Sequence, residues 1–88
     1  MHEAGLTRDL LAQISRLAEE AGADSVTCVS VCLGALSHMS PEHFKYHFDQ
    51  EAGGSIAEDA RLDIETSDDI HHPQAQSVLL RSIEVAEH

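Results

Sequence analysis

The sequence is poor in basic residues, and this shortage argues against several classes of function. Five lysines and arginines stand against sixteen aspartates and glutamates, so the formal net charge is -11, and Lys45 is the single lysine. A surface that binds phosphate groups needs clustered basic side chains. We therefore expect no nucleic-acid partner and no binding to an anionic membrane. The acidic balance suits metal cations or a basic protein partner, although solubility alone is the simpler interpretation.

Cysteines and long apolar runs are scarce as well. The longest apolar stretch, Val26–Leu36, is too short and too mixed to span a bilayer. An acidic Glu3 follows His2 where a secretory signal peptide carries basic residues, so we expect no export. Cys28 and Cys32 are the only cysteines and provide no disulfide framework, which agrees with a reducing cytosol. The sequence therefore predicts a cytoplasmic protein without a membrane span.

Aromatic residues number only three, all within Phe44–Phe48, so most of the core must be aliphatic. A chain of 88 residues provides one thin core, because it buries only about 60–65% of its unfolded surface. We expect a single domain over residues 1–88.

Two amphipathic helices are expected. Apolar residues recur at intervals of three and four over residues 6–21, and Gly22 then supplies the left-handed residue that commonly ends a helix. Ser40–Pro41 has the residue types of an N-cap followed by a first helical position. That second helix is predicted to reach Ala52, with its phenylalanines inward, and to be stopped by Gly53–Gly54.

Three strands complete the prediction. Residues 25–36 are β-branched and apolar on both faces, as in a central strand, with Gly34 at a bulge or at the end of pairing. Arg61–Thr66 alternates like a half-buried strand, and Val78–Val85 is the third candidate, after the polar loop Ser67–Gln76. The order helix, strand, helix, strand, strand predicts an α+β fold, a small three-stranded sheet with both helices packed on one face.

The sequence contains no recognisable catalytic set. It lacks a glycine-rich phosphate loop, a nucleophile elbow and a cysteine–histidine pair with an orienting partner, so we expect a protein that is not an enzyme. Cys28 and Cys32 share one face of the predicted strand about 13 Å apart, too far for one metal ion or a disulfide. We interpret them as buried core thiols.

Histidine is abundant, with seven in 88 residues, and imidazole is a usual ligand of nickel, copper and zinc. The free α-amine of Met1, the backbone nitrogen of His2 and the His2 imidazole form fused chelate rings, a planar nitrogen-rich set that Ni(II) and Cu(II) favour. Glu3 is close enough to add a backbone nitrogen or its carboxylate. Spacing alone does not decide between this chelate and a solvated terminal histidine.

Two other groups of histidines have alternative interpretations. His43 and His47 are four residues apart on the second predicted helix, a spacing that brings two imidazoles to one metal, although solvated side chains are the simpler interpretation. The polar loop either holds a metal weakly or forms a turn, and its four ligand-type side chains are Asp68, Asp69, His71 and His72.

Five segments in order resemble one known family. Met1-His2-Glu3, opening an amphipathic helix, is similar to the start of the HypA/HybF hydrogenase nickel-incorporation proteins. Leu33–Ser37 at the end of the first strand, Ser40–Phe44 at the second helix, Gly54–Leu62 and the closing Ser82–Val85 resemble that family's later segments in the same order. Each motif alone is weak, whereas five in register are specific.

The resemblance implies a nickel metallochaperone for the metal centre of nickel–iron hydrogenase and, in some organisms, of urease. It implies that Met1, His2 and Glu3 bind Ni(II). It further implies delivery to the hydrogenase large subunit together with a nickel-handling GTPase. The choice between a monomer and a homodimer stays open.

One segment of the chain differs from the family pattern. Family members carry a zinc domain between their second and third strands, held by two Cys-x-x-Cys pairs, and this chain has the cysteine-free loop 67–76 there. Structural zinc is therefore not expected, and the core should still fold because all its strands remain. Two hypotheses follow: a zinc-less nickel carrier, or an interaction and regulatory module that keeps the fold without metal delivery. A histidine-rich zinc or copper buffer with several weak sites is a minor third.

Nickel affinity is predicted to fall at acid pH. An unperturbed amine has a pKa of about 8 and an imidazole of about 6.5, and both must lose a proton before they bind the ion. Calorimetric titration with Ni(II) should therefore show an affinity more than about a hundredfold weaker at about pH 5.5 than at about pH 8. An affinity that stays constant over this interval would rule out the nitrogen-ligand hypothesis.

Overall fold

The computed structural model describes residues 3–86, with side chains described from residue 7 onward. Its elements are α1 (Glu3–Glu20), β1 (Ser25–Leu33), α2 (Pro41–Ala52), β2 (Arg61–Thr66) and β3 (Val78–Ala86). This order confirms the predicted α+β fold. None of the helices in the described part of the chain is long and apolar enough to cross a membrane.

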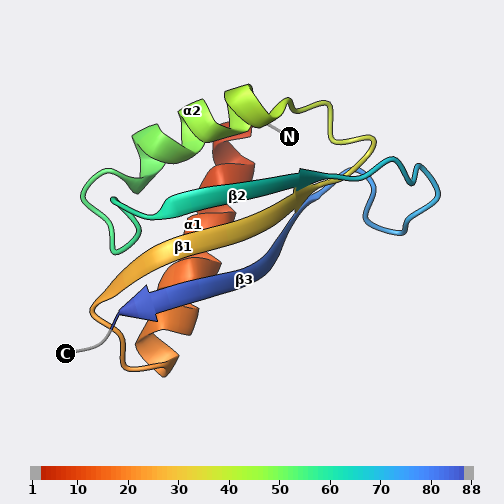
Figure 1. Cartoon of the computed structure of the whole chain (residues 1–88). Helices are drawn as coiled ribbons and strands as arrows, with labels where there is room; N and C mark the ends of the chain where they lie inside the picture. Colours follow the sequence, from red (N-terminus) through yellow and green to blue (C-terminus); the bar gives the residue numbers. More distant parts are fainter. Residues whose placement is uncertain (1–2, 87–88) are drawn as a thin grey trace.

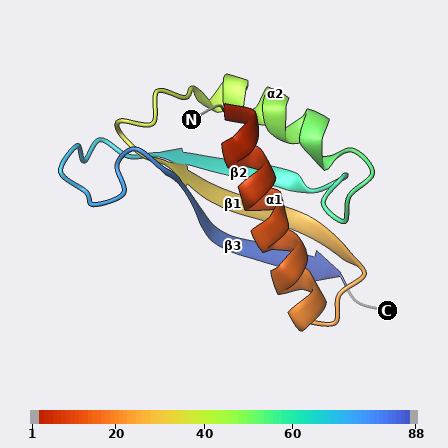
Figure 2. The same ribbon diagram turned by 180° about the vertical axis from the view of Figure 1, so that it is seen from behind.

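The sheet has the strand order β2-β1-β3, so β1 is central as predicted (Figure 1). It pairs in parallel with β2, where Val29 is opposite Leu62, and antiparallel with β3, where Val29 is opposite Ile83. α1 crosses behind the sheet in Figure 1 and in front of it in Figure 2, and α2 runs alongside β2. Buried side chains of both helices share one core cluster with those of β1, so both helices pack on the same face. The expected two-layer arrangement is therefore confirmed.

The core lies between the helices and the inward face of β1. Its largest fully buried side chains come from α1, α2 and β1: Thr7, Ile14, Val29, Val31, Leu33, Phe44 and Phe48. Burying one large aliphatic or aromatic side chain stabilises the fold by about 1.5–3 kcal/mol. The two phenylalanines, which face inward as predicted, thus hold α2 in one orientation against the sheet.

Local hydrogen bonds account for the helix ends. Ser40 is the N-cap of α2, and its Oγ accepts a bond from the His43 N–H at 3.1 Å. At the end of α1, the Ala23 N–H donates to the Ala18 carbonyl and the Gly22 N–H to the Glu19 carbonyl, both at 3.0 Å. With Gly22 at φ 69°, this is a Schellman motif, as the glycine predicted.

The strand expected over residues 25–36 ends at Leu33, so Gly34 marks the end of pairing, one of the two predicted alternatives. The residues that follow bond to the loop between β2 and β3. The Gly34 N–H donates to the Ser77 carbonyl at 2.9 Å, and the Leu36 N–H donates to the Ala75 carbonyl at 2.8 Å. A Cβ at Gly34 would lie 2.1 Å from the Ala75 carbonyl oxygen, so only glycine allows this approach.

Backbone atoms of the loop lie so close to Gly34 that replacing this glycine is predicted to destabilise the protein. In Gly34→Ala the new methyl meets backbone atoms of Ala75 and Ser77, which are held by pairing and must shift. We expect the free energy of unfolding, measured by urea denaturation, to fall by about 1–3 kcal/mol.

Gly53→Ala is the matched control, because φ is -57° there and the nearest atom to a new Cβ is the Gln50 carbonyl oxygen at 3.6 Å. It should change the free energy of unfolding by no more than about 0.5 kcal/mol. Equal effects of the two substitutions would contradict the assigned contact.

Candidate metal centre

The N-terminal ligand prediction lies at the edge of what the structure describes. Met1 and His2 are outside the described residues, and of Glu3 only the backbone is described, as the first residue of α1. The structure does place the start of this helix, whose first turn lies beside α2 in both ribbon views (Figures 1 and 2). An ion pair between the exposed Arg8 Nε and the half-buried Glu51 Oε2, at 3.5 Å, also joins the two helices.

One pair of candidate histidines is brought together on α2. The imidazole centroids of His43 and His47 are 4.8 Å apart, with 32° between the ring planes. His43 is exposed and His47 is half-buried, whereas Phe44 and Phe48 point into the core. The rings of Tyr46 and His47 are arranged edge to face, at a centroid distance of 5.5 Å. The two imidazoles therefore share one patch at the outer side of the helix.

Polar side chains of the loop between β2 and β3 form hydrogen bonds with the backbone of the same loop. The Asp69 carboxylate accepts from the His71 N–H at 3.0 Å, and Ser67 Oγ accepts from the Asp69 N–H at 3.1 Å. Asp68, Asp69, His71 and His72 are all exposed. Within the residues whose side chains are described, no three histidine, cysteine or acidic side chains converge as a metal would require. The hypothesis of a second metal site on this loop therefore gains no support here.

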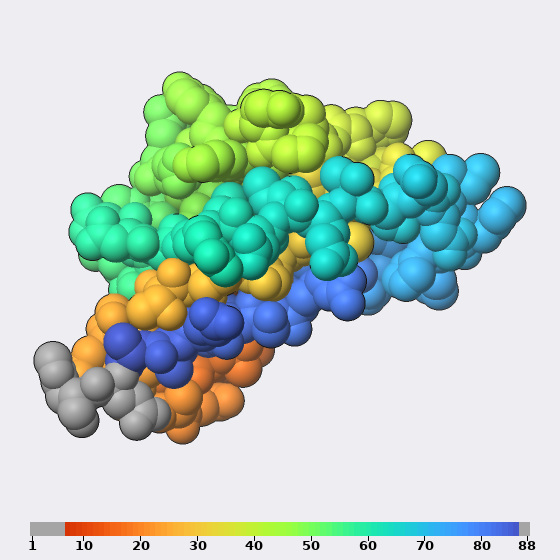
Figure 3. Space-filling model, viewed as in Figure 1, coloured from red at the N-terminus to blue at the C-terminus, as the bar shows by residue number. Residues whose placement is uncertain are grey.

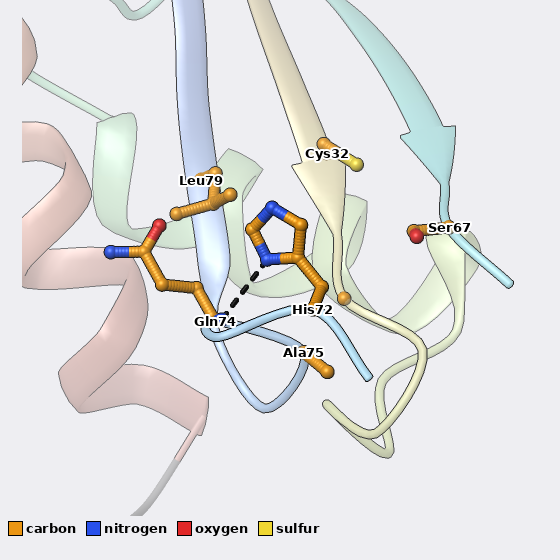
Figure 4. A pocket seen from close by; sticks show the side chains of 7 residues that line it. Cys32, Ser67, His72, Gln74, Ala75 and Leu79 are labelled. Carbon is orange, nitrogen blue, oxygen red and sulfur yellow. Dashed lines mark hydrogen bonds between the residues drawn. The ribbon is translucent and has the colours of Figure 1, made fainter. Parts of the chain in front are cut away.

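His72 nevertheless meets Cys32 across a small pocket of about 40 Å³ (Figure 4). The figure shows the imidazole between Leu79 of β3 and the Cys32 side chain of β1. His72 Nδ1 accepts a hydrogen bond from the Gln74 N–H at 3.0 Å, which fixes the ring against the backbone of its own loop. The arrangement ties the loop to the sheet.

Cys28 lies on the face of the sheet opposite the helices. Its thiol donates to Asp63 Oδ2 at 3.6 Å and accepts from Arg61 Nη2 at 3.8 Å, and Arg61 pairs with Asp63 at 3.3 Å. The hydrogen bond to Cys28 and the charge of Asp63 raise the pKa of the Arg61 guanidinium, so it stays charged. In the space-filling view of this face, β1 is visible as a strip between β2 and β3 (Figure 3).

The prediction that both cysteines are buried core thiols is therefore confirmed only in part. Both are free, and Cys28 is buried, but beneath Arg61 rather than among the side chains that face the helices. Cys32 is only half-buried, because it borders the pocket with His72. The sequence pattern of β1 could not reveal this, since both environments depend on which residues of β2 and β3 lie opposite.

Comparison with known proteins gives one consistent family. Residues 1–72 match the family described as hydrogenase/urease nickel incorporation, metallochaperone, hypA. The hydrogenase maturation factor HypA of Methanosarcina mazei is 40% identical over 65 residues, which are 74% of this chain and 47% of that protein. The same factor of Rhodopseudomonas palustris is 41% identical over 64 residues, or 73% and 57%. This chain thus aligns with about half the length of these relatives.

Two solved structures share the fold. The solution structure of the Ni metallochaperone HypA from Helicobacter pylori superposes with a TM-score of 0.83 at 20% sequence identity, covering 100% of both chains. A second solution structure, described as HypA protein, gives a TM-score of 0.77 at 22% identity, covering 100% of this chain and 98% of that one. At these identities the comparison establishes the architecture alone.

Thiol modification should distinguish the two cysteines. Cys28 exposes 5% of its surface beneath Arg61, whereas Cys32 is partly open to solvent at the pocket. We expect iodoacetamide to alkylate Cys32 of the folded protein well before Cys28, as followed by timed quenching and peptide mass spectrometry. Both should react at similar rates in urea. Equal rates in the folded protein would contradict the burial of Cys28.

Proposed function

This chain belongs to the HypA family of hydrogenase/urease nickel-incorporation metallochaperones, and from that premise we propose that it binds Ni(II) through its N-terminus and delivers it for the maturation of nickel–iron hydrogenase. One observation carries the proposal: the family match extends over residues 1–72 and so includes the N-terminal Met1-His2-Glu3. The ion is the cargo of the protein, and its action is transfer rather than catalysis.

The chemistry of the first three residues suits this cargo. The Met1 amine, the His2 backbone nitrogen and the His2 imidazole are consecutive donors on one stretch of chain, and Ni(II) favours planar sets rich in nitrogen. Glu3 adds a carboxylate or a further backbone nitrogen. These donors need a free amine, so the site depends on an unmodified N-terminus.

The fold supports the proposal by anchoring the chain directly after these residues. Glu3 is the first residue of α1, and Thr7 and Leu10 on the same helix are buried in the core. A ligand set next to an anchored helix loses less conformational entropy on binding than one at the end of a long mobile tail.

A nickel-handling GTPase and the hydrogenase large subunit are the proposed partners, acting in the cytoplasm, with urease as a second client class. We also propose residues 1–88 as one nickel-binding domain, with loop 67–76 in place of a cysteine-held zinc domain. The chain has no cysteine outside β1, so this loop offers no thiolate for structural zinc.

An interaction or regulatory module without metal delivery is the second candidate. The same cysteine-free loop favours it, because a relative that lacks a zinc segment also lacks whatever partner contacts that segment makes. The two candidates differ in whether the N-terminus binds nickel.

Nickel titration separates these candidates. We expect untagged protein with its native Met1 to bind one Ni(II) in the micromolar range or tighter by calorimetry. This high-affinity site should disappear in His2→Ala and in a protein extended by residues before Met1, because each change removes a nitrogen donor.

His71→Ala with His72→Ala is the matched control, since both residues are exposed in the loop between β2 and β3. This double variant should keep the high-affinity site. Weak binding by the native protein, or tight binding that survives both N-terminal changes, would contradict nickel delivery from the N-terminus and favour the interaction module.

A further inference from the structure

The outer side of α2 carries two neighbouring imidazoles, those of His43 and His47. We propose that His43 and His47 together bind a borderline divalent transition-metal ion, of the class of Ni(II), Cu(II) and Zn(II), at a site separate from the N-terminus. Binding at this pair does not depend on the proposed N-terminal site. Only one further role rests on the proposed function, namely that nickel binds first at this pair of histidines.

The helix holds the two imidazoles in one row. Residues four apart on a helix are neighbours on its surface, and this is the spacing at which two histidines of a helix bind zinc in metalloproteases. The N-cap at Ser40 holds the first turn of α2, and the buried Phe44 and Phe48 prevent the helix from rotating. The backbone carrying both ligands is therefore in place before an ion arrives.

The distance between the rings suits one shared ion. With metal–nitrogen bonds of about 2.0–2.1 Å, each ring centroid lies roughly 3.2 Å from the metal. Two such rings are then about 4.5 Å apart at a right angle and about 5.2 Å apart at a tetrahedral angle. The observed separation of 4.8 Å between His43 and His47 lies between these values. Side-chain torsions alone can therefore turn a nitrogen of each ring toward a common point.

The nature of the donors defines the class of ion. Two neutral imidazoles select borderline metals over Mg²⁺ and Ca²⁺, which prefer oxygen ligands. Among the residues with described side chains no third histidine, cysteine or acidic group completes a set of three, so water occupies the remaining positions when the pair alone binds the ion. A site with two protein ligands exchanges its metal readily, unlike a closed structural site.

The electrostatic surroundings favour a cation. The chain has a formal net charge of -11, which raises the local concentration of divalent ions. Lys45, the single lysine, lies between the two histidines in sequence but pairs with Asp49 at 2.7 Å, so its charge is compensated. The start of α1 lies beside α2 (Figure 2). The histidine pair on α2 is therefore on the neighbour of the helix that begins with the proposed N-terminal ligands.

The test uses the full chain with a short N-terminal extension, which removes the free amine and leaves α2 intact. We expect this protein to bind one Ni(II), and likewise one Zn(II), more weakly than the native protein binds nickel. Substoichiometric Ni(II) should broaden the imidazole NMR signals of His43 and His47 before those of the other histidines. His43→Gln, and the double variant with His47→Gln, should lower the affinity at least about tenfold, since even an outer-sphere partner of a ligand contributes about 10–100-fold.

His71→Gln with His72→Gln is the control pair and should leave the affinity of the extended protein unchanged. The amide spectrum of each variant reports its fold, and His43→Gln alters only an exposed side chain. The proposal is overturned if the extended protein binds neither ion, if other histidines broaden first, or if His43→Gln binds as before. A different result would contradict the N-terminal proposal alone: native protein that shows no tight nickel site, while Ni(II) still broadens the signals of His43 and His47 first.

Discussion

Pairing along both edges of β1 is the constraint on which the rest of the structure depends. Val29 and Val31 are fully buried under the helices, while the edges of the strand bond to β2 and β3. A parallel pair needs a crossover connection, so the chain must pass over one face between β1 and β2, and α2 is that crossover. The helix that carries His43 and His47 is therefore positioned by the topology of the sheet, and α1 covers the rest of the same face.

The far end of the sheet is closed by backbone contacts. Gly34 admits the carbonyl groups of Ala75 and Ser77, and His72 packs against Leu79 and Cys32 from the same loop. These contacts join the end of β1 to the connection between β2 and β3. They give a physical reason why the three-stranded core accommodates a short loop at this point.

Local sequence signals predicted the elements of this fold well. The cap at Ser40, the glycine after α1 and the alternation in Arg61–Thr66 each depend on a few neighbouring residues, and all three are confirmed. Features that depend on partners distant in sequence were predicted less completely. Gly34 was expected at a bulge or at the end of pairing, and the loop opposite it decides for the end of pairing. The burial of Cys28 was predicted, whereas its contact with Arg61 across the sheet was not. For the candidate site, spacing gave the His43–His47 pair, whereas Met1, His2 and the side chain of Glu3 stay predictions because they lie outside the described part.

Nickel X-ray absorption on the one-to-one complex of native protein identifies the ligand atoms and so tests nickel binding at the N-terminus. We expect a first shell of nitrogen and oxygen alone, with the outer-shell scattering of imidazole and no sulfur. Both cysteines lie on β1, where Cys28 is beneath Arg61 and Cys32 lines a pocket with His72, whose Nδ1 accepts a backbone N–H. A sulfur shell at the longer bond length typical of thiolates, about 2.3 Å for zinc, would contradict N-terminal binding and show that the nickel is held at the cysteines of the sheet.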